Sequence, residues 1–571
     1  MRSQELRKIA PELDPLRLGT GWKEEDLSKT QIMIESTFGD SHPGSGHLLE
    51  LVEEAREGVR KAGGFGARYF TTDICDGEAQ GHDGINYSLV SRDMIANMIE
   101  IHANATPFDG GIFIASCDKG MPAHLMGIGR VNIPSIVITG GVMEAGPNLL
   151  TLEQIGAYHA MYQRGEITEE KLNYYKHNAC PSCGACSFMG TASTMQIMAE
   201  ALGLMLPGSA LMPATSKELR EFAFEAGKQA VWLANQNLTP DKIVTKKSFE
   251  NAIMIHGAIS GSTNSLLHLP AIAKEFGIEI DGDTFERLHR GAHYILNIRP
   301  SGKWPAQYFY YAGGVPRIME EIKEMLHLDV MTVTGKTLGE NLDNLKKNGF
   351  YDKCKMYLDK IGVAQEDIIR PFKQPFGTDG SIGILYGNLA PGGAVVKHTA
   401  VPKEMFKAVL KARPFDCEED AIHAIVTHEI QPGDAVIIRY EGPKGSGMPE
   451  MFYTTEAISS DEKLGASIAL LTDGRFSGAS KGPAIGHISP EAADGGPIAL
   501  VEEGDLIQID IPKRRLQIIG IKEIEMSQEE ITKILEERKK QWKPKEAKYA
   551  KGVLKLFSEH AVSPMKGGYM E

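Results

Sequence analysis

Residues 110–120 read Gly110-Gly-Ile-Phe-Ile-Ala-Ser-Cys-Asp-Lys-Gly120, a short apolar run that leads directly into a thiol, a carboxylate and an amine. A second apolar run, Ile133-Pro-Ser-Ile-Val-Ile-Thr-Gly-Gly141, follows it. Short apolar runs bounded by turn residues are typical of buried strands, and residues 86–105 just before them have helical periodicity. This alternation predicts a parallel sheet covered by helices.

The texture of the sequence changes near Pro371. Helical segments rich in alanine and methionine precede it, and short Val/Ile-rich runs separated by glycine and proline follow it, at 394–397, 424–426, 434–440 and 505–511. We therefore predict an α/β domain over residues 1–370 and a β-rich, barrel-like domain over residues 371–571. The charged stretch 527–543 predicts a surface helix near the end of the chain.

Composition and charge exclude several classes of protein. The chain has 571 residues, 42% hydrophobic and 24% charged, with a net charge of −14. Its basic residues are scattered, which argues against a nucleic-acid partner. No apolar run is long enough to span a bilayer, and residues 1–22 lack the apolar core of a secretion signal. We expect a cytoplasmic protein whose seven cysteines serve metal binding or thiolate chemistry rather than disulfides.

Two Cys-Asp pairs stand directly after apolar segments. Cys117 and Asp118, with Lys119, follow the run at 110–116, and Cys75 and Asp76 follow another short apolar segment. The carboxyl end of a parallel strand is where α/β sheets expose functional groups. Thiolates suit iron-sulfur centres and carboxylates suit magnesium, so one site could hold both kinds of metal.

Three further cysteines stand in Cys180-Pro-Ser-Cys183-Gly-Ala-Cys186. This spacing is similar to part of a ferredoxin cluster motif, but the fourth nearby cysteine and its trailing proline are missing. We expect one or two of these thiols to be ligands, and a structural zinc knuckle is the alternative. Two glycine-rich loops, at 442–450 and 472–478, bring a reactive side chain close to backbone amides, as anion binding requires.

Taken in order, these segments resemble the dihydroxy-acid and phosphogluconate dehydratases from about residue 32 to residue 511. The motifs that carry the resemblance include Asp76-Gly-Glu-Ala-Gln-Gly-His82, Cys117-Asp-Lys119, Gly261-Ser-Thr-Asn264, Gly387-Asn-Leu-Ala-Pro391, Gly447-Met-Pro-Glu450, Thr472-Asp-Gly-Arg-Phe-Ser-Gly478 and Gly486-His-Ile-Ser-Pro490. Family members pair an α/β region with a barrel-like domain, which agrees with the texture change near residue 371.

The resemblance implies an iron-sulfur cluster, a magnesium ion and a role for each matching residue. Cys117 and Cys186 match cluster cysteines, and Ser477 matches the serine proposed as the catalytic base. The residues matching the magnesium site are Asp76, Asp118, Glu450 and Lys119, the last of which is carbamylated in family members. Three thiolates suit either a 2Fe-2S or a 4Fe-4S cluster, and the resemblance implies a homodimer or homotetramer.

One departure from the family pattern concerns the cluster. The family usually supplies its first cluster cysteine from a Pro-Cys-Asn segment, but here Gly44 stands in its place. Cys75 is our choice for the missing ligand because it stands next to Asp76, and because the xylonate-dehydratase subgroup also has Cys-Asp-Gly there. Cys183 is the competing choice, and His47 is a third.

The same subgroup resembles this chain at 115–122, 312–316 and 330–335. The resemblance implies a sugar acid such as D-xylonate or another aldonate as the small-molecule substrate, converted to the 2-keto-3-deoxy acid. In this hypothesis magnesium anchors the carboxylate and 2-hydroxyl, an iron accepts the 3-hydroxyl, and Ser477 takes the C2 proton. The alternatives are dihydroxy-acid dehydratase of branched-chain amino-acid synthesis and, in another class, an electron-transfer or iron-sensing protein.

Overall fold

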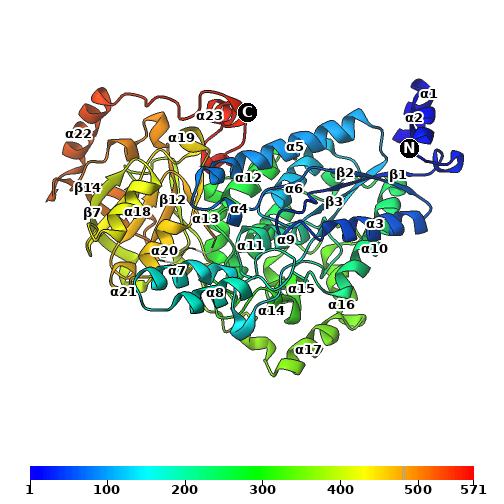
Figure 1. The fold of residues 1–571 in the computed structure, drawn as a ribbon, viewed down its shortest axis with the longest axis horizontal. Helices are drawn as coiled ribbons and strands as arrows, with labels where there is room; N and C mark the ends of the chain where they lie inside the picture. Colours follow the sequence, from blue (N-terminus) through cyan, green and yellow to red (C-terminus); the bar gives the residue numbers. More distant parts are fainter. Residues whose placement is uncertain (479, 481) are drawn as a thin grey trace.

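The first part of the chain is built on a four-stranded parallel sheet in the order β2-β1-β3-β4 (Figure 1). The computed structural model describes residues 1–478, 480 and 482–571. The strands are β1 (Gln31–Ser36), β2 (Phe65–Phe70), β3 (Gly110–Ala115) and β4 (Ser135–Thr139). The strands predicted at 110–116 and 133–141 are confirmed, and every residue of β1, β3 and β4 is buried. Burial on both faces explains why these strands are apolar without alternation.

Helices cover both faces of this sheet. In Figure 1 the sheet lies between one pair of helices, α5 (Tyr87–Ala105) and α6 (Gly120–Val131), and a second pair, α3 (Leu48–Lys61) and α10 (Lys217–Gln236). The predicted helix at 86–105 is thus confirmed as α5. Behind them α9 (Thr191–Ala201), α11 (Lys246–Ile259) and α12 (Ser265–Glu275) are almost entirely buried.

The second part of the chain forms a curled nine-stranded sheet in the order β15-β14-β13-β7-β8-β10-β12-β6-β5. Tyr386, just after β5, pairs with Arg515 at the start of β14, so the sheet nearly closes on itself. This confirms the predicted barrel-like architecture. The strands are β5 (Gly383–Leu385), β6 (Gly393–Val396), β7 (Lys407–Phe415), β8 (Asp434–Ile438), β10 (Ala469–Thr472), β12 (Ala484–Ser489), β13 (Leu506–Asp510), β14 (Arg515–Ile521) and β15 (Ile524–Glu525).

One apolar run was assigned to the wrong kind of element. Residues 424–426 lie in the helix α18 (Glu418–Val426), whose buried residues Ala421, Ala424 and Ile425 follow helical spacing. The predicted terminal helix is confirmed as α22 (Gln528–Gln541), which begins with a capping box from Ser527.

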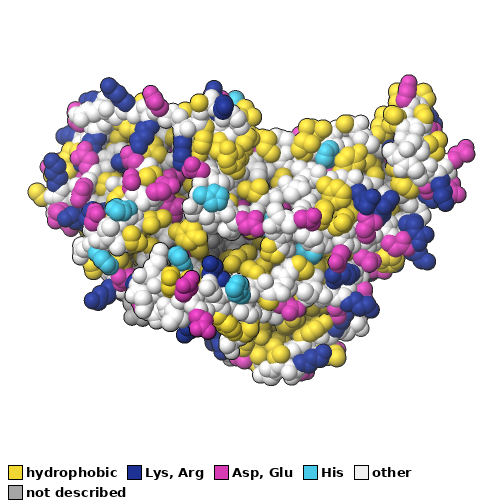
Figure 2. All heavy atoms as spheres, viewed as in Figure 1, with side chains coloured by type: hydrophobic (Ala, Val, Ile, Leu, Met, Phe, Trp, Pro, Cys, Tyr) yellow, Lys and Arg dark blue, Asp and Glu magenta, His cyan; other side chains and the backbone are white. Residues whose placement is uncertain are grey.

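A two-stranded parallel ladder, β9 (Glu450–Met451) and β11 (Arg475–Phe476), pairs Glu450 with Arg475. On the face drawn in Figure 2, acidic and basic side chains are interspersed and the surface is hollowed between the two parts of the molecule. We find no helix in the described part of the chain with the length and apolar character needed to cross a membrane. The domain boundary at residue 370 stays a prediction.

Candidate active site

The loops after three adjacent strands supply most of the candidate residues. His42 follows β1, Cys75 and Asp76 follow β2, and the segment 117–119 follows β3. Because these strands are parallel, their carboxyl ends meet at one edge of the sheet. Residues that are distant in the sequence therefore converge there, as the strand-end argument predicted.

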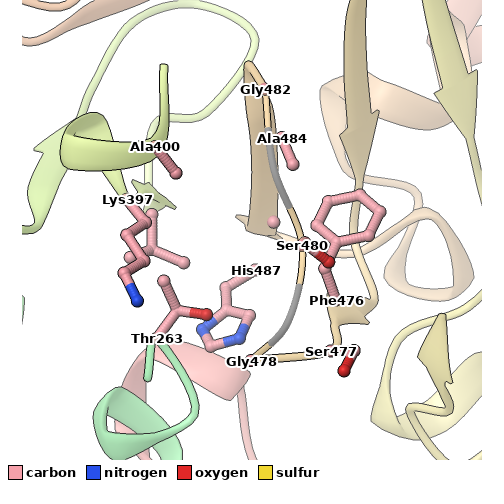
Figure 3. Close-up of a pocket in the computed structure, with 12 residues that line it drawn as sticks. Thr263, Lys397, Ala400, Phe476, Ser477, Gly478, Ser480, Gly482, Ala484 and His487 are labelled. Atoms are coloured by element: carbon pink, nitrogen blue, oxygen red, sulfur yellow. The ribbon is translucent and has the colours of Figure 1, made fainter. Parts of the chain in front are cut away.

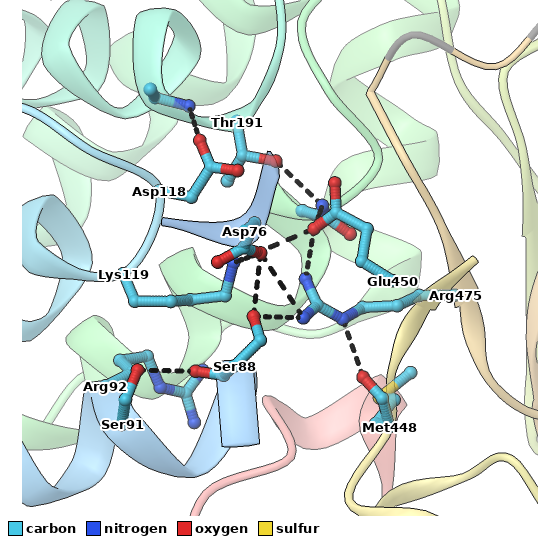
Figure 4. A network of polar contacts seen from close by, with 12 residues as sticks. Asp76, Ser88, Ser91, Arg92, Asp118, Lys119, Thr191, Met448, Glu450 and Arg475 are labelled. Atoms are coloured by element: carbon cyan, nitrogen blue, oxygen red, sulfur yellow. Dashed lines mark hydrogen bonds and ion pairs between the residues drawn. The ribbon is translucent and has the colours of Figure 1, made fainter. Parts of the chain in front are cut away.

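Three carboxylates form a possible site for a hard metal ion. Asp76, Asp118 and Glu450 each offer an oxygen, and these oxygens lie within 4.8 Å of one another. The Asp118 carboxylate also accepts a hydrogen bond from the backbone N–H of Ala192, at 2.8 Å, in the first turn of α9. Figure 4 shows the carboxylates gathered from three separate parts of the fold. Oxygen donors in such a group suit magnesium.

Two buried cations hold these carboxylates. Lys119 Nζ lies 2.7 Å from an oxygen of Asp76 and 3.7 Å from one of Glu450. Arg475 donates to Glu450 at 2.7 Å, to Ser88 Oγ at 3.0 Å and to the Met448 carbonyl at 2.9 Å (Figure 4). Sequence reasoning included Arg475 in a motif but gave it no role.

The electrostatics of the group favour an added cation. Burial raises the pKa of Asp118 to about 6 and that of Glu450 to about 7. Burial also acts to raise the pKa of Asp76, but the charges of Lys119 and Arg475 together hold it below its usual value. Asp76 Oδ1 is buried without a hydrogen-bond partner among the described residues. Three carboxylates outnumber the two cations, so the group fits a divalent ion.

A second group offers softer donors. A ring nitrogen of His42 and the sulfurs of Cys75 and Cys117 lie within 4.8 Å of one another. The hydrogen bond between the two thiols lowers the pKa of Cys75 and raises that of Cys117 well above its usual value, the latter reinforced by burial. Each of these two thiols directly precedes a carboxylate of the first group, in Cys75-Asp76 and in Cys117-Asp118. The two groups therefore lie close together, as the expected mixed site requires.

The remaining thiols lie outside this group. Burial raises the pKa of Cys186 well above its usual value, and the charge of Cys75 adds to the shift, so the two thiols interact electrostatically. Cys183 is half-buried and Cys180 is exposed. His47 Nε2 lies 2.7 Å from the Gly140 carbonyl oxygen. The structure thus brings Cys75, rather than Cys183 or His47, beside Cys117.

Ser477 lines a pocket next to the β9-β11 ladder (Figure 3). Lys397, His487 and Thr263 line the same pocket, and Figure 3 shows them facing one another. Burial lowers the pKa of Lys397 to about 7, and burial with the charge of Arg475 lowers that of His487 to about 3.

Neither the Lys397 amine nor the His487 ring has a hydrogen-bond partner within the described ranges. His487 also adopts a left-handed backbone conformation with φ of 57°, which often marks a functional position. Sequence reasoning noted His487 within a motif but left it out of the site, and it missed Lys397 altogether.

Comparison with known proteins identifies related sequences. Models of the N-terminal and C-terminal regions of dihydroxy-acid/6-phosphogluconate dehydratases match residues 29–341 and 367–568. Dihydroxy-acid dehydratase 1 of Methanosarcina acetivorans is 42% identical over 97% of this chain and 96% of its own length. Dihydroxy-acid dehydratases of Methanosarcina barkeri (42%, all of both chains) and Ignicoccus hospitalis (40%, 99% of both) are similar.

These relatives contradict the expected sugar-acid substrate. They match the chain over nearly its whole length and carry another name, whereas the likeness to xylonate dehydratases rested on short segments such as 312–316 and 330–335. Short segments shared between enzymes of one family do not identify the substrate. The sugar-acid interpretation was therefore wrong.

Proposed function

Because the chain belongs to the dihydroxy-acid/6-phosphogluconate dehydratase family, and is therefore a hydro-lyase, we propose that it dehydrates a 2,3-dihydroxy acid with a branched aliphatic chain. The observation that carries this proposal is the identity of 40–42% over full length to relatives named dihydroxy-acid dehydratase. The expected product is the corresponding 2-keto acid.

The pocket beside Ser477 supports an aliphatic substrate. Val395, Ala400, Phe476 and Ala484 form the apolar part of its wall. These apolar side chains can contact the methyl groups of a branched acid, and the polar side chains that line the same pocket can contact its hydroxyls.

Both donor groups fit the inorganic cofactors of the proposal. Asp76, Asp118 and Glu450 would hold Mg²⁺, with Lys119 as a further ligand if it is carbamylated. Cys75, Cys117 and Cys186 would hold an iron-sulfur cluster. When bound, these centres supply Lewis acidity to the substrate carboxylate and hydroxyl oxygens.

The chain itself must remove and return a proton. Ser477 is the proposed base at C2, and its backbone N–H donates to the Met451 carbonyl at 3.2 Å, which fixes the loop after β11. A serine hydroxyl is a weak base near neutral pH, so its ionised form needs positive potential nearby. Lys397 lines the same pocket and is our candidate for this role.

The test is a comparison of two substrates. Anaerobically purified protein with Mg²⁺ is supplied with 2,3-dihydroxyisovalerate or xylonate, and the 2-keto product is measured. We expect turnover of the branched acid with kcat/KM at least 100-fold higher than for xylonate. Equal or greater turnover of xylonate would contradict the proposal. A cytoplasmic location and a homodimeric or homotetrameric state stay predictions, the latter checked by light scattering.

A further inference from the structure

His42 lies between the two thiols and a carboxylate that orients its ring. Its side chain is buried, with 3% of the residue exposed. Its Nε2 lies 3.1 Å from Asp73 Oδ1, and the same oxygen accepts a hydrogen bond from Ser45 Oγ at 2.5 Å. Nδ1 is buried and has no hydrogen-bond partner among the residues that the structure describes. A buried polar atom without a partner is costly, and one beside a thiol that could share a metal indicates a ligand that would satisfy it.

Residue 44 is glycine, so it places no side chain beside Nδ1. A Cβ at Gly44 would lie 3.0 Å from His42 Nδ1 and 3.2 Å from Cys117 Sγ. His42 Nδ1 and Cys117 Sγ are therefore both close to the position that a side chain at residue 44 would occupy. Glycine at this position thus avoids a side chain that would crowd the imidazole and the thiol together.

The spacing of the donors fits one inorganic centre. Donors on a single tetrahedral metal lie about 3.5–4 Å apart, given bond lengths of about 2.0–2.3 Å. A ring nitrogen of His42 and the sulfurs of Cys75 and Cys117 lie within 4.8 Å of one another. The imidazole and a thiol are thus close enough to share one iron of a cluster.

We propose that His42 Nδ1 is a nitrogen ligand of the iron-sulfur cluster, in addition to the thiols of Cys75, Cys117 and Cys186. This inference rests on the proposed function, which supplies the cluster. The hydrogen bond from Nε2–H to Asp73 fixes the tautomer that leaves the lone pair on Nδ1, as carboxylates commonly do for metal-binding histidines. Imidazole replaces thiolate in some iron-sulfur centres and raises their reduction potential.

The charge of the donor gives this ligand a distinct role. The imidazole is neutral when it binds, whereas each cysteine binds as a thiolate. Displacing a thiolate would separate an anion from the positively charged iron, whereas displacing the neutral imidazole would not. His42 is therefore the ligand that a substrate hydroxyl would replace most easily. We expect nitrogen ligation in the resting protein and its loss when substrate binds.

Pulsed electron paramagnetic resonance on the reduced holoenzyme tests the inference without relying on turnover. Protein grown with ¹⁵N-histidine should show a ¹⁵N coupling to the cluster in place of the ¹⁴N coupling. His42→Cys should keep its iron and sulfide, lose that coupling and have a lower reduction potential. His47→Gln, in the same loop, is the matched control and should retain the coupling.

Two results distinguish failure of the His42 proposal from failure of the proposed function. Wild-type protein with a full cluster but no histidine nitrogen coupling would overturn the role of His42 and leave the dehydratase proposal standing. Protein reconstituted anaerobically that holds no iron-sulfur cluster would overturn both. Because the isotope experiment uses the wild-type chain, it decides the matter even where His42→Cys fails to fold.

Discussion

Lys119 presents a conflict that can be measured. Its Nζ lies 2.7 Å from Asp76 and 3.7 Å from Glu450, two of the carboxylates proposed to bind Mg²⁺. An ion held by those oxygens would lie about 4 Å from the ammonium, and a charge of +2 facing +1 at that distance is repelled by about 8 kcal/mol at an effective dielectric constant of about 20. Carbamylation replaces the cation by an anion and turns this repulsion into attraction.

The protein can relieve part of the repulsion by moving the side chain or releasing its proton. If only about a third of the energy remains, Mg²⁺ affinity still falls about 100-fold, because about 1.4 kcal/mol corresponds to a factor of ten. We therefore expect wild-type protein in buffer free of carbon dioxide to bind Mg²⁺ at least 100-fold more weakly than protein treated with bicarbonate. Lys119→Met carries neither the ammonium nor the carbamate charge. Its affinity for Mg²⁺ should lie between those two affinities and should not change with bicarbonate.

Isothermal titration of Mg²⁺ into chelator-treated, cluster-loaded protein measures these affinities. Asp118→Asn serves as the control, because it removes an oxygen charge and should weaken binding with or without bicarbonate. The reasoning fails if wild-type affinity is indifferent to bicarbonate, or if Lys119→Met binds Mg²⁺ no better than wild-type protein free of carbon dioxide.

Four further outcomes are expected. Ser477→Ala should lower kcat by about 10²–10⁴-fold, the usual contribution of a general base, with cluster absorbance unchanged; a nearly fully active variant would reject Ser477 as the base. Cys75→Ser should reduce iron content, and an unaltered iron assay and spectrum would remove Cys75 from the ligand set. Arg475→Lys keeps the charge but loses about two of three charged hydrogen bonds, each worth about 1.5–3 kcal/mol. The midpoint of thermal unfolding should therefore fall clearly. A midpoint equal to that of the wild type would show that the three bonds are dispensable. Burial raises the pKa of Glu491 from 4.5 to about 8, so its contribution to stability is full below pH 4.5 and is lost as pH rises through 8. The free energy of unfolding of Glu491→Gln, measured with urea, should therefore decline less between pH 5 and 9 than that of the wild type. Parallel declines in the two proteins would contradict the shift.

Much of the fold could be predicted from local patterns, because a strand that is buried on both faces is apolar along its length. Apolar runs bounded by glycine located β3 and β4, since both faces of these strands are covered. The run at 424–426 was misassigned because three apolar residues cannot distinguish a strand period from a helical one. Its helix is evident only over the longer spacing from Ala421 to Ile425.

The site was predictable where its chemistry is contiguous. Cys75-Asp76 and Cys117-Asp118 pair soft and hard donors within a dipeptide, and the structure places both pairs at one edge of the sheet. Lys397 has no such signal, because its importance comes from burial without a partner. The substrate was misjudged because the short segments that resemble the xylonate-dehydratase subgroup say less about it than similarity over the whole chain does.

Segments that leave the ribosome at very different times meet in this site. Arg475 and Ser88, which share a hydrogen bond, are 387 residues apart in the sequence, whereas the thiols of Cys75 and Cys117 are made early, on the loops after β2 and β3. A nascent chain therefore exposes these thiols to oxygen and stray metals long before Glu450 exists to complete the carboxylate group. The carboxylate group is thus completed only after the second part of the chain has been made and has folded.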